Sequence, residues 1–547
     1  MVQQTDFAPI SPDAPTTDRF RVYVTTDLTE FSLRLLEEAA DIDLVQTSPR
    51  TKFVRENLPR AHAIIARDDV ELSREIIGLA NHLRVIGRVG AGLNGIDMDA
   101  ATERGIIVMN TPGTSAIAAA EHTVLLMLAL SRRLPMVHNA MKEGWWLLDR
   151  TAQAGTQLYG KTLGIYGLGR VGSEVARRAA AFGMDILAFD PYIADEQIKD
   201  LRVTMVSQKE LLARSDYVSI HVPLTKDTNT LFDAGLIAQM KPGAHLINAA
   251  AGRIWDEGAV AQALQSGQLS GVAVDTFVQE PPYNSPLVGM DNVVHTPHIG
   301  DNTVEATQDV SIQIVQQVLD ALRGTDYRNA VNMPLLPGMN FEEIRPLLML
   351  GERVGQLQHA LARSPIRRVA VETNGDEMDG MVKPLTVAIL KGILDPVLSQ
   401  SVSYINAPVL AAERGLHVTQ TKGLRTANYA NMLSCQVFWE DGTEIIISGT
   451  LLDHREPHIV QIDRYAINFV PDGRLLIMGS YDRPGVIGRV ATMLADNSIN
   501  IASWYTGRTG PGGNTLTVLN LDDPLPVDLL AQLRDLDFVR HAVQVEL

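Results

Sequence analysis

The feature that most constrains this chain is a glycine cluster near its centre, Gly167-Leu-Gly169-Arg-Val-Gly172. An apolar, strand-like segment precedes the cluster, and a helical pattern follows it. Glycines permit a tight turn and let the backbone approach a pyrophosphate, whose charge the helix N-terminus stabilises. A second strand-like segment ends at Asp190, where a carboxylate can accept hydrogen bonds from ribose hydroxyls. The pattern predicts a dinucleotide site that favours NAD over NADP, because a carboxylate repels a 2′-phosphate.

The organisation of the chain predicts four folded domains. Up to about residue 330, short apolar runs alternate with helical patterns, which indicates parallel, doubly wound sheets. The end of the chain has the order strand, helix, strand, strand, helix, strand, which is typical of a ferredoxin-like unit. We predict a disordered tail over 1–18, a flavodoxin-like substrate-binding domain over 19–112 and 303–330, an inserted Rossmann cofactor domain over 113–302, an intervening α+β domain over 331–470, and a C-terminal ferredoxin-like domain over 472–547.

The composition excludes several classes of protein. Of 547 residues, 46% are hydrophobic and 20% are charged, as in a well-packed globular chain. The net charge of −17 argues against nucleic-acid or anionic-membrane binding, which needs clustered Lys and Arg. We see no signal-peptide or membrane-spanning pattern. The single cysteine, Cys435, excludes an intrachain disulfide and a thiolate metal cluster, so we expect a cytoplasmic protein without a metal and a buried Cys435.

Four later strand-like segments run directly into small or polar residues, within His221–Thr225, Asn248–Gly252, Asp275–Phe277 and Thr296–Gly300. The carboxyl ends of parallel strands share one edge of a sheet, so these residues should meet the glycine cluster in one crevice. Among them, His298 and Glu280 could form an acid/base pair that takes a proton from an alcohol as hydride leaves. The local pattern alone allows a structural alternative equally well. In it, His298 is a hydrogen-bonded polar residue at a strand end, and Glu280 is a solvated acid in a loop.

Several motifs resemble the D-isomer-specific 2-hydroxyacid dehydrogenases. They are Tyr159–Gly172, Asp190-Pro191, Asp256-Glu257, Asp275 with Glu280-Pro-Pro282, and Thr296-Pro-His298-Ile-Gly300. The resemblance extends over nearly the whole chain to the long form of this family, through Pro365-Ile-Arg-Arg-Val, Lys391–Val397 and Asn406–Pro408, and the end resembles an ACT domain through Asp482–Gly488 and Asn500–Ala502. It implies NAD-dependent oxidation of D-3-phosphoglycerate to 3-phosphohydroxypyruvate, which opens L-serine biosynthesis.

The resemblance also implies roles for individual residues. His298 matches the family's acid/base and Glu280 its partner. The implied cofactor contacts are Gly167, Gly169, Arg170, Val171, Gly172, Asp190, Val222, Ala249, Ala250, Ala251, Asp275 and Gly300. The implied substrate contacts are Arg67, Arg88 and Ala91, and the implied contacts of an L-serine effector are Asp482, Gly485 and Asn500. A homodimer or homotetramer is also implied, with the apolar segment 118–130 as an interface helix or as core.

The substrate side departs from the family pattern. Ala251 stands where the family has an arginine that grips the substrate carboxylate. Alternate side chains of an extended segment share a face, so we predict that Arg253 partly replaces it. Asp68 and Asp69 follow Arg67 and should repel a phosphate. Two alternatives therefore stay open: a dehydrogenase for another 2-hydroxy acid, and a weakly catalytic protein that senses NAD and amino acids.

Overall fold

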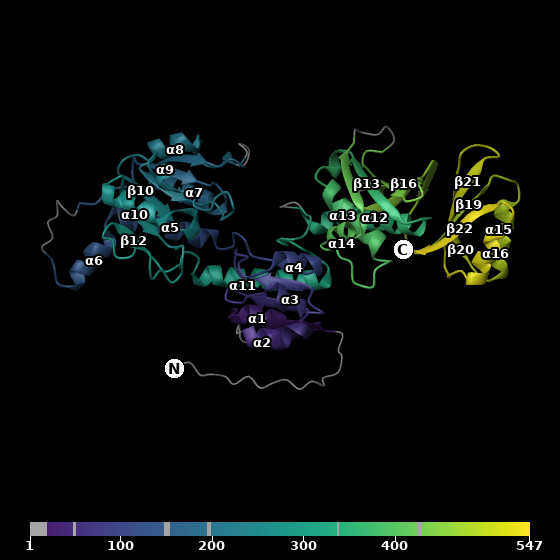
Figure 1. The fold of residues 1–547 in the computed structure, drawn as a ribbon, viewed down its shortest axis with the longest axis horizontal. Helices are drawn as coiled ribbons and strands as arrows, with labels where there is room; N and C mark the ends of the chain where they lie inside the picture. The colour runs from purple at the N-terminus through teal and green to yellow at the C-terminus, as the bar shows by residue number, and fades with distance from the viewer. Residues whose placement is uncertain are drawn as a thin grey trace. The chain divides into compact units, whose positions relative to one another are not determined.

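The computed structural model describes residues 19–47, 51–146, 154–193, 198–335, 339–423, 429–453 and 455–547 (Figure 1). The predicted tail, 1–18, lies outside these residues. The chain forms two compact units, which we describe separately. The first comprises the chain up to Asp27, Arg34–Asn110 and Ile314–Leu547, and the second comprises Leu28–Leu33 and Thr111–Gln313. Among the described residues, no helix is long and apolar enough to cross a membrane.

The first sheet has five parallel strands in the order β2-β1-β3-β4-β5. This is the order of flavodoxin-like folds, as predicted. Strand β4 packs closely against helix α11, because a Cβ at Gly87 would lie 2.6 Å from a methyl carbon of Val318. The elements are β1 (Phe20–Val24), α1 (Glu30–Glu37), β2 (Ile42–Gln46), α2 (Thr51–Asn57), β3 (Ala63–Ala66), α3 (Arg74–Gly78), β4 (Val85–Arg88), α4 (Met98–Glu103), β5 (Ile107–Met109) and α11 (Val304–Arg323).

The second sheet has seven parallel strands in the order β12-β11-β10-β9-β6-β7-β8. The chain runs outward from β6 in one direction through β7 and β8, and in the other through β9 to β12. Ligands of such open sheets bind beyond the carboxyl ends of the strands, at the point where the strand order reverses, which here is beside β6. The elements are α5 (Ala116–Ser131), α6 (Leu134–Lys142), β6 (Thr162–Tyr166), α7 (Arg170–Ala181), β7 (Asp185–Phe189), β8 (Thr204–Met205), α8 (Gln208–Arg214), β9 (Tyr217–Ile220), α9 (Ala234–Ile237), β10 (Ala244–Asn248), α10 (Glu257–Ser266), β11 (Leu269–Val274) and β12 (Val293–His295).

The intervening part has a mixed six-stranded sheet in the order β14-β13-β15-β16-β17-β18. Cys435 lies on β15, is buried as predicted, and its burial raises the pKa of the thiol to about 12. The elements are α12 (Phe341–Ala360), β13 (Ile366–Asn374), α13 (Val382–Leu394), α14 (Ala407–Glu413), β14 (His417–Lys422), β15 (Met432–Trp439), β16 (Glu444–Leu452), β17 (Glu456–Ile462) and β18 (Tyr465–Phe469).

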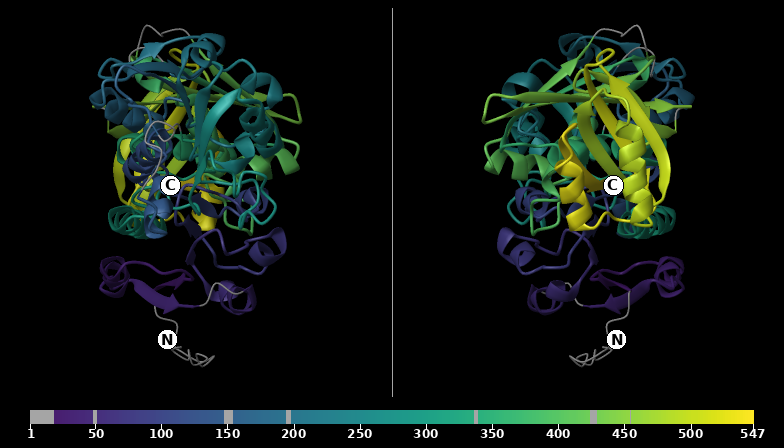
Figure 2. Two further views of the ribbon diagram at one scale, coloured as in Figure 1. Left: turned by 90° about the vertical axis from the view of Figure 1, so that its left-hand side faces the viewer. Right: turned by 90° about the vertical axis from the view of Figure 1, so that its right-hand side faces the viewer.

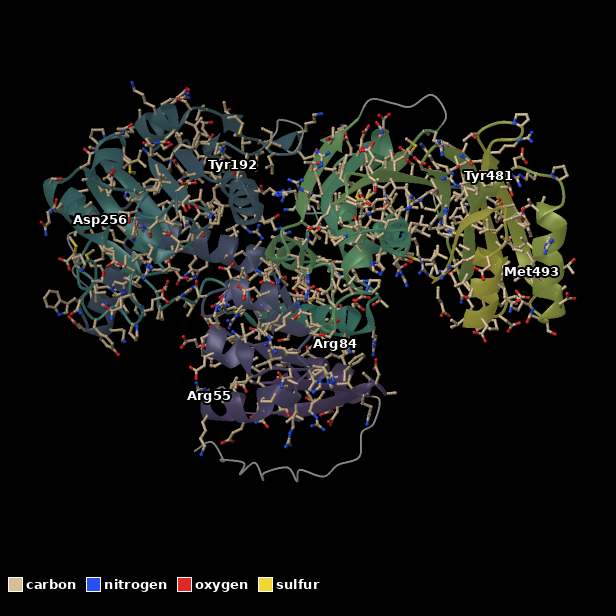
Figure 3. The ribbon with its side chains drawn as sticks, turned by 45° about the vertical axis from the view of Figure 1, so that its right-hand side comes forward. Arg55, Arg84, Tyr192, Asp256, Tyr481 and Met493 are labelled. Atoms are coloured by element: carbon tan, nitrogen blue, oxygen red, sulfur yellow. The ribbon has the colours of Figure 1, made fainter. Side chains whose placement is uncertain are left out.

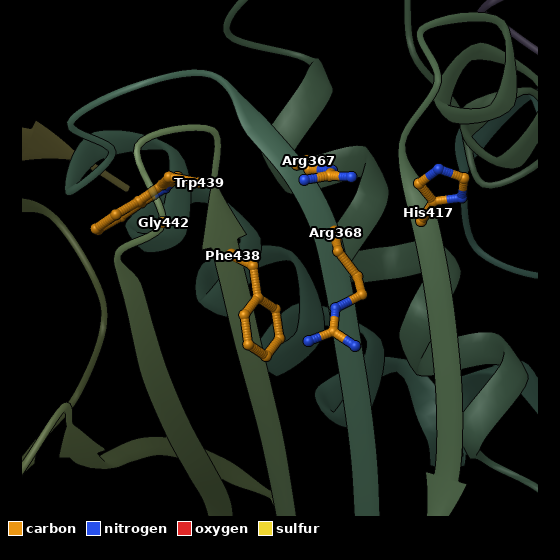
Figure 4. A pocket seen from close by; sticks show the side chains of 6 residues that line it. All are labelled: Arg367, Arg368, His417, Phe438, Trp439 and Gly442. Atoms are coloured by element: carbon orange, nitrogen blue, oxygen red, sulfur yellow. The ribbon is translucent and has the colours of Figure 1, made fainter.

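A β-bulge marks the start of β13. Ile366 pairs with Trp439 and Arg368 pairs with Phe438, so Arg367 is the extra residue of its strand. The guanidinium of Arg368 lies 3.7 Å from the centre of the Phe438 ring. Both arginines line a hollow of about 380 Å³ (Figure 4). The bulge thus places two adjacent cationic side chains beside the same hollow, whereas an unbroken strand would send them to opposite faces.

The last part is a four-stranded antiparallel sheet in the order β20-β21-β19-β22, with two helices on one face (Figure 2). Side chains alternate across β19: Leu476 and Met478 pack under the helices, while Leu475 and Ile477 join the core of the intervening part. The elements are β19 (Arg474–Tyr481), α15 (Val486–Asp496), β20 (Ile501–Arg508), β21 (Asn514–Leu521), α16 (Val527–Arg534) and β22 (Val539–Glu546). This order confirms the predicted ferredoxin-like unit.

Candidate active site

The glycine loop joins β6 to α7 and can be built only from glycine at two of its positions. Gly167 has φ +96°, and a Cβ there would lie 2.8 Å from the carbonyl of His221. A Cβ at Gly172 would lie 2.2 Å from the carbonyl oxygen of Gly167. Around Gly169, by contrast, a Cβ would meet no atom within 4 Å, so this position is open to a ligand. The cradle therefore fits a pyrophosphate at the N-terminus of α7.

Asp190 lies at the end of β7, where the sequence predicts contact with a ribose. One oxygen of its carboxylate accepts a hydrogen bond of 2.9 Å from Leu168 N, and the other accepts one of 2.9 Å from Tyr192 N. Tyr192 itself is exposed on the surface (Figure 3). These bonds fix the carboxylate beside the glycine loop and leave lone pairs for two hydroxyls. The Asp190 carboxylate can therefore accept hydrogen bonds from a ribose, which supports NAD as the cofactor.

The other predicted cofactor residues follow the parallel strands β9, β10, β11 and β12 and so share one edge of the sheet. Val222 is half-buried beside Gly167. The side chain of Asn248 organises the turn after β10, because it accepts from Ala250 N and donates to the carbonyl oxygen of Ala251, both at 3.0 Å. Asp275 binds Gly300 N through its carboxylate at 2.8 Å. The ends of these four strands and the glycine loop therefore lie along one edge of this sheet, and a shared binding crevice there stays a prediction.

His298 and Glu280 form a hydrogen-bonded pair, with 2.8 Å between Nδ1 and Oε2. The other oxygen of Glu280 accepts a bond of 3.0 Å from Phe277 N, which fixes the carboxylate. Burial lowers the pKa of His298, but the hydrogen bond and charge of Glu280, with the charges of Asp275 and Asp301, raise it overall. With Nδ1 bound to Glu280, Nε2 is the nitrogen that can exchange a proton with a substrate.

The premise behind the Arg253 prediction is wrong. Residues Gly252–Ile254 form a turn of 3₁₀ helix and not an extended segment, so residues two apart do not share a face. The turn forms because Gly252 packs against the backbone of Phe277, where a Cβ would lie 2.0 Å from the carbonyl. Arg253 is exposed, and its carbonyl oxygen accepts a bond of 2.7 Å from Thr230 N. Contact between Arg253 and a substrate carboxylate stays a prediction.

The predicted substrate residues lie in the first sheet's unit and differ in their surroundings. Arg88, at the end of β4, is 1% exposed and its guanidinium donates to the carbonyl oxygens of Arg67 and, at 2.9 Å, Asn94. Burial lowers the pKa of Arg88, against the charges of Asp68 and Asp69. Arg67 is exposed, and the carbonyl of Ala91 accepts a bond of 2.7 Å from Asn110. Arg88 thus holds the loop that presents Arg67.

The predicted effector residues lie in the last domain. Asp482 accepts a hydrogen bond of 3.1 Å from Gly512 N, and Asn500 donates one of 2.7 Å to Asp522. Gly485, the N-cap residue just before α15, has φ +92°, a conformation that other residues rarely adopt. Loop and strand are therefore ordered around these positions, while effector binding remains a prediction.

Sequence reasoning missed His122, on α5, whose Nε2 lies 2.9 Å from Thr296 Oγ1 and 3.3 Å from Asp275 Oδ1. The signal that could have found it is an imidazole on a mostly apolar helix, directly after the charged Glu121. Within the part of the chain that the structure describes, no three His, Cys, Asp or Glu side chains gather as a metal site requires.

The glycine cradle lies where the strand order of a parallel sheet reverses, and the His298–Glu280 pair lies in loops that follow strands β11 and β12 of the same sheet. Together they define a nicotinamide-dependent dehydrogenase. Residues 124–300 match the profile of the NAD-binding domain of D-isomer specific 2-hydroxyacid dehydrogenases, residues 343–463 the D-3-phosphoglycerate dehydrogenase intervening domain, and residues 474–538 the ACT domain. The chain belongs to the D-isomer specific 2-hydroxyacid dehydrogenase family, in the form that carries these two further domains. It is an NAD-dependent oxidoreductase.

Relatives in sequence support this assignment over nearly the full length. The chain is 39% identical over 510 residues to D-3-phosphoglycerate dehydrogenase of Archaeoglobus fulgidus, which covers 93% of this chain and 96% of the relative. It is 36% identical over 528 residues to the enzyme of that name from Methanocaldococcus jannaschii, over 96% of this chain and all of the relative.

A solved structure supports the fold of the first part. D-lactate dehydrogenase of Aquifex aeolicus, complexed with NAD and lactic acid, is 29% identical with a TM-score of 0.50. It covers 56% of this chain and 96% of its own.

Proposed function

We propose that the protein catalyses the NAD-dependent oxidation of D-3-phosphoglycerate to 3-phosphohydroxypyruvate, the first step of L-serine biosynthesis. The observation that carries the chemistry is the His298–Glu280 hydrogen bond of 2.8 Å, in loops that follow strands of the sheet that bears the glycine cradle. The substrate is supported by the intervening and ACT domains and by relatives named D-3-phosphoglycerate dehydrogenase.

The proton transfers follow from the geometry of the pair. NAD, when bound, accepts the hydride that leaves C2 of the hydroxy acid. As that C–H bond breaks, neutral His298 takes the proton of the C2 hydroxyl at Nε2, and the carbonyl forms. Glu280 stabilises the imidazolium so produced, and in the reverse reaction the imidazolium returns the proton to the carbonyl oxygen. His298 thus serves as base for oxidation and as acid for reduction.

We assign the substrate anion to Arg67, with Arg88 and Ala91 shaping the loops beside it. The Arg67 side chain is exposed whereas Arg88 is buried, and the guanidinium of Arg88 holds the backbone of Arg67 through its carbonyl oxygen. A guanidinium suits a phosphate or a carboxylate because it offers paired donors. The acids at Asp68 and Asp69, both exposed, weaken this site for a phosphate and make the substrate worth testing against other 2-oxo acids.

We also propose L-serine as effector of the ACT domain, at Asp482, Gly485 and Asn500, and a homodimer or homotetramer as the assembly. The apolar segment 118–130 has both a buried and an exposed side, because Leu126 and Leu130 are buried in the core while Leu125 is exposed; the exposed side supports the interface role. Further large apolar side chains on and after α5 and α6 are exposed, as an interface requires: Ile117, Leu134, Met136, Met141, Trp145 and Trp146. A cytoplasmic location remains our prediction from the single reduced cysteine.

The experiment is a steady-state assay of NADH oxidation with 3-phosphohydroxypyruvate, glyoxylate, pyruvate and 2-oxoglutarate, each with and without L-serine. We expect kcat/KM to be highest for 3-phosphohydroxypyruvate and L-serine to inhibit. A higher kcat/KM for another acid would reassign the substrate. If the protein binds NADH but oxidises it with none of these acids, the proposed enzymatic activity is refuted, and the alternative of a protein that senses NAD and amino acids is favoured.

A further inference from the structure

Asp275, at the end of β11, holds the loop that carries His298. Its Oδ1 accepts hydrogen bonds from Thr296 Oγ1 at 2.5 Å and Ile299 N at 3.0 Å, and its Oδ2 accepts one from Gly300 N at 2.8 Å. Its carbonyl oxygen accepts a further bond of 2.9 Å from His298 N. Successive N–H groups of the loop therefore all point to this one residue, which is 1% exposed.

The backbone of His298 needs this support because it is in the left-handed region, with φ +51°. Such a conformation is strained for a residue with a Cβ, so the loop relaxes unless its surroundings hold it. Successive N–H groups beside a left-handed residue form a concave site for an anion, and the Asp275 carboxylate fills it. Gly300 is required for this approach, because a Cβ there would lie 2.9 Å from Oδ2. The direction of the His298 imidazole thus depends on where Asp275 is fixed.

His122 reaches the same carboxylate from helix α5. Its side chain is 10% exposed, and Nε2 lies 2.9 Å from Thr296 Oγ1 and 3.3 Å from Asp275 Oδ1. The hydroxyl of Thr296 donates to Asp275, so its oxygen is left to accept from the Nε2–H tautomer of His122. Burial raises the pKa of Asp275, but the bonds from His122, Thr296 and the loop lower it to about 2, so the carboxylate stays charged.

We propose that His122 is a positioning residue for the reaction: its N–H fixes Thr296 and Asp275, and through them the left-handed backbone that aims His298 at the substrate. The inference rests on the proposed role of His298 as acid and base. It gives the imidazole of this mostly apolar helix a role that core packing alone does not require. The bonds His122–Thr296–Asp275–loop form one continuous path from α5 to the reacting proton.

The test replaces the imidazole and then restores the donor. His122→Leu keeps the volume and removes the N–H, and we expect kcat for 2-oxo acid reduction to fall about 10- to 100-fold. The Kd for NADH should change less than about threefold, because the glycine cradle is untouched. The pH midpoint of kcat should move to lower pH, because His298 then separates from Glu280. His122→Gln offers an N–H donor again and should recover most of the rate.

A control separates positioning from stability. Leu126→Ala removes a buried side chain from the core of the same helix and should lower Tm at least as much as His122→Leu. Its pH midpoint should equal that of the wild type. Equal midpoints in His122→Leu and the wild type, the same shift in Leu126→Ala, or no recovery in His122→Gln would overturn the proposal.

A second readout keeps the inference separate from the proposed function. Histidine-selective NMR, with the His298 signal assigned from the His298→Asn spectrum, follows the imidazole pKa without any turnover. We expect the raised pKa of His298 to fall in His122→Leu and to return in His122→Gln. An unchanged pKa would refute the positioning role even in an active enzyme, whereas the expected fall in a protein that turns over no acid would refute only the proposed function.

Discussion

Replacing Glu280 by glutamine tests the acid/base pair with little change of shape. The bond to His298 is 2.8 Å long, and a hydrogen bond between charged partners contributes about 1.5–3 kcal/mol. The side chains of His298 and Glu280 are 54% and 40% exposed, so solvent screening reduces the figure to about 1–2 kcal/mol. We therefore expect kcat to fall roughly 5- to 30-fold.

The pH dependence gives the same perturbation a direction. Glu280 raises the pKa of His298 against the lowering effect of burial, so Glu280→Gln should lower it. Oxidation needs neutral His298 and reduction needs the protonated form, so both pH midpoints should move to lower pH in the variant. The Tm difference from the wild type should be full below the ordinary histidine pKa and disappear as the pH rises through the raised one.

The assay is NADH oxidation and NAD reduction across a pH series, with Asp291→Asn as a control that changes an exposed acid of the same unit. We expect the control to match the wild type in midpoint and in kcat. An unshifted midpoint in Glu280→Gln, or a shift to higher pH, would refute the claim that Glu280 stabilises the imidazolium.

Three further predictions address the cofactor and the substrate. Gly172→Ala places a Cβ 2.2 Å from a backbone oxygen, so it should lower Tm by several degrees and weaken NAD binding. Gly169→Ala has open space around it, so it should weaken NAD binding at unchanged Tm. Calorimetry measures Tm and titration measures NAD binding. Asp190→Ser should raise the NADPH/NADH ratio of kcat/KM about tenfold or more, because the 2′-phosphate is no longer repelled. Arg67→Ala should raise the KM for 3-phosphohydroxypyruvate at unchanged Tm, whereas Arg88→Ala should lower Tm, because buried carbonyl groups lose their donor.

The fold could be predicted where the sequence carries local signals. The glycine cluster follows a strand whose Leu163 and Ile165 are fully buried, and this pattern identifies the centre of the second sheet. The order of elements in the ACT domain could likewise be predicted from alternating runs. Strands without such a signal were missed: β14 (His417–Lys422) is exposed along most of its length, and β8 (Thr204–Met205) has only two residues.

The site could be predicted only in part, because much of it depends on contacts between distant segments. His298 and Glu280 are near in sequence, and both belong to motifs that resemble the family's, so the sequence identifies them. The 3₁₀ turn at Arg253 depends on Gly252 packing against Phe277, and no local pattern predicts that contact. The role of His122 needs residues 122, 275 and 296 to meet, which the chain order does not show. Predicted domain boundaries stay predictions.

The most direct test of the central claim is the turnover of His298→Asn with NADH and 3-phosphohydroxypyruvate. Asparagine tolerates the left-handed φ of +51°, so the loop and the cofactor cradle should be kept while the acid/base is lost. We expect kcat to fall about 10²- to 10⁴-fold with a nearly unchanged Kd for NADH. A variant that keeps most of the wild-type kcat would contradict the assignment of proton transfer to His298.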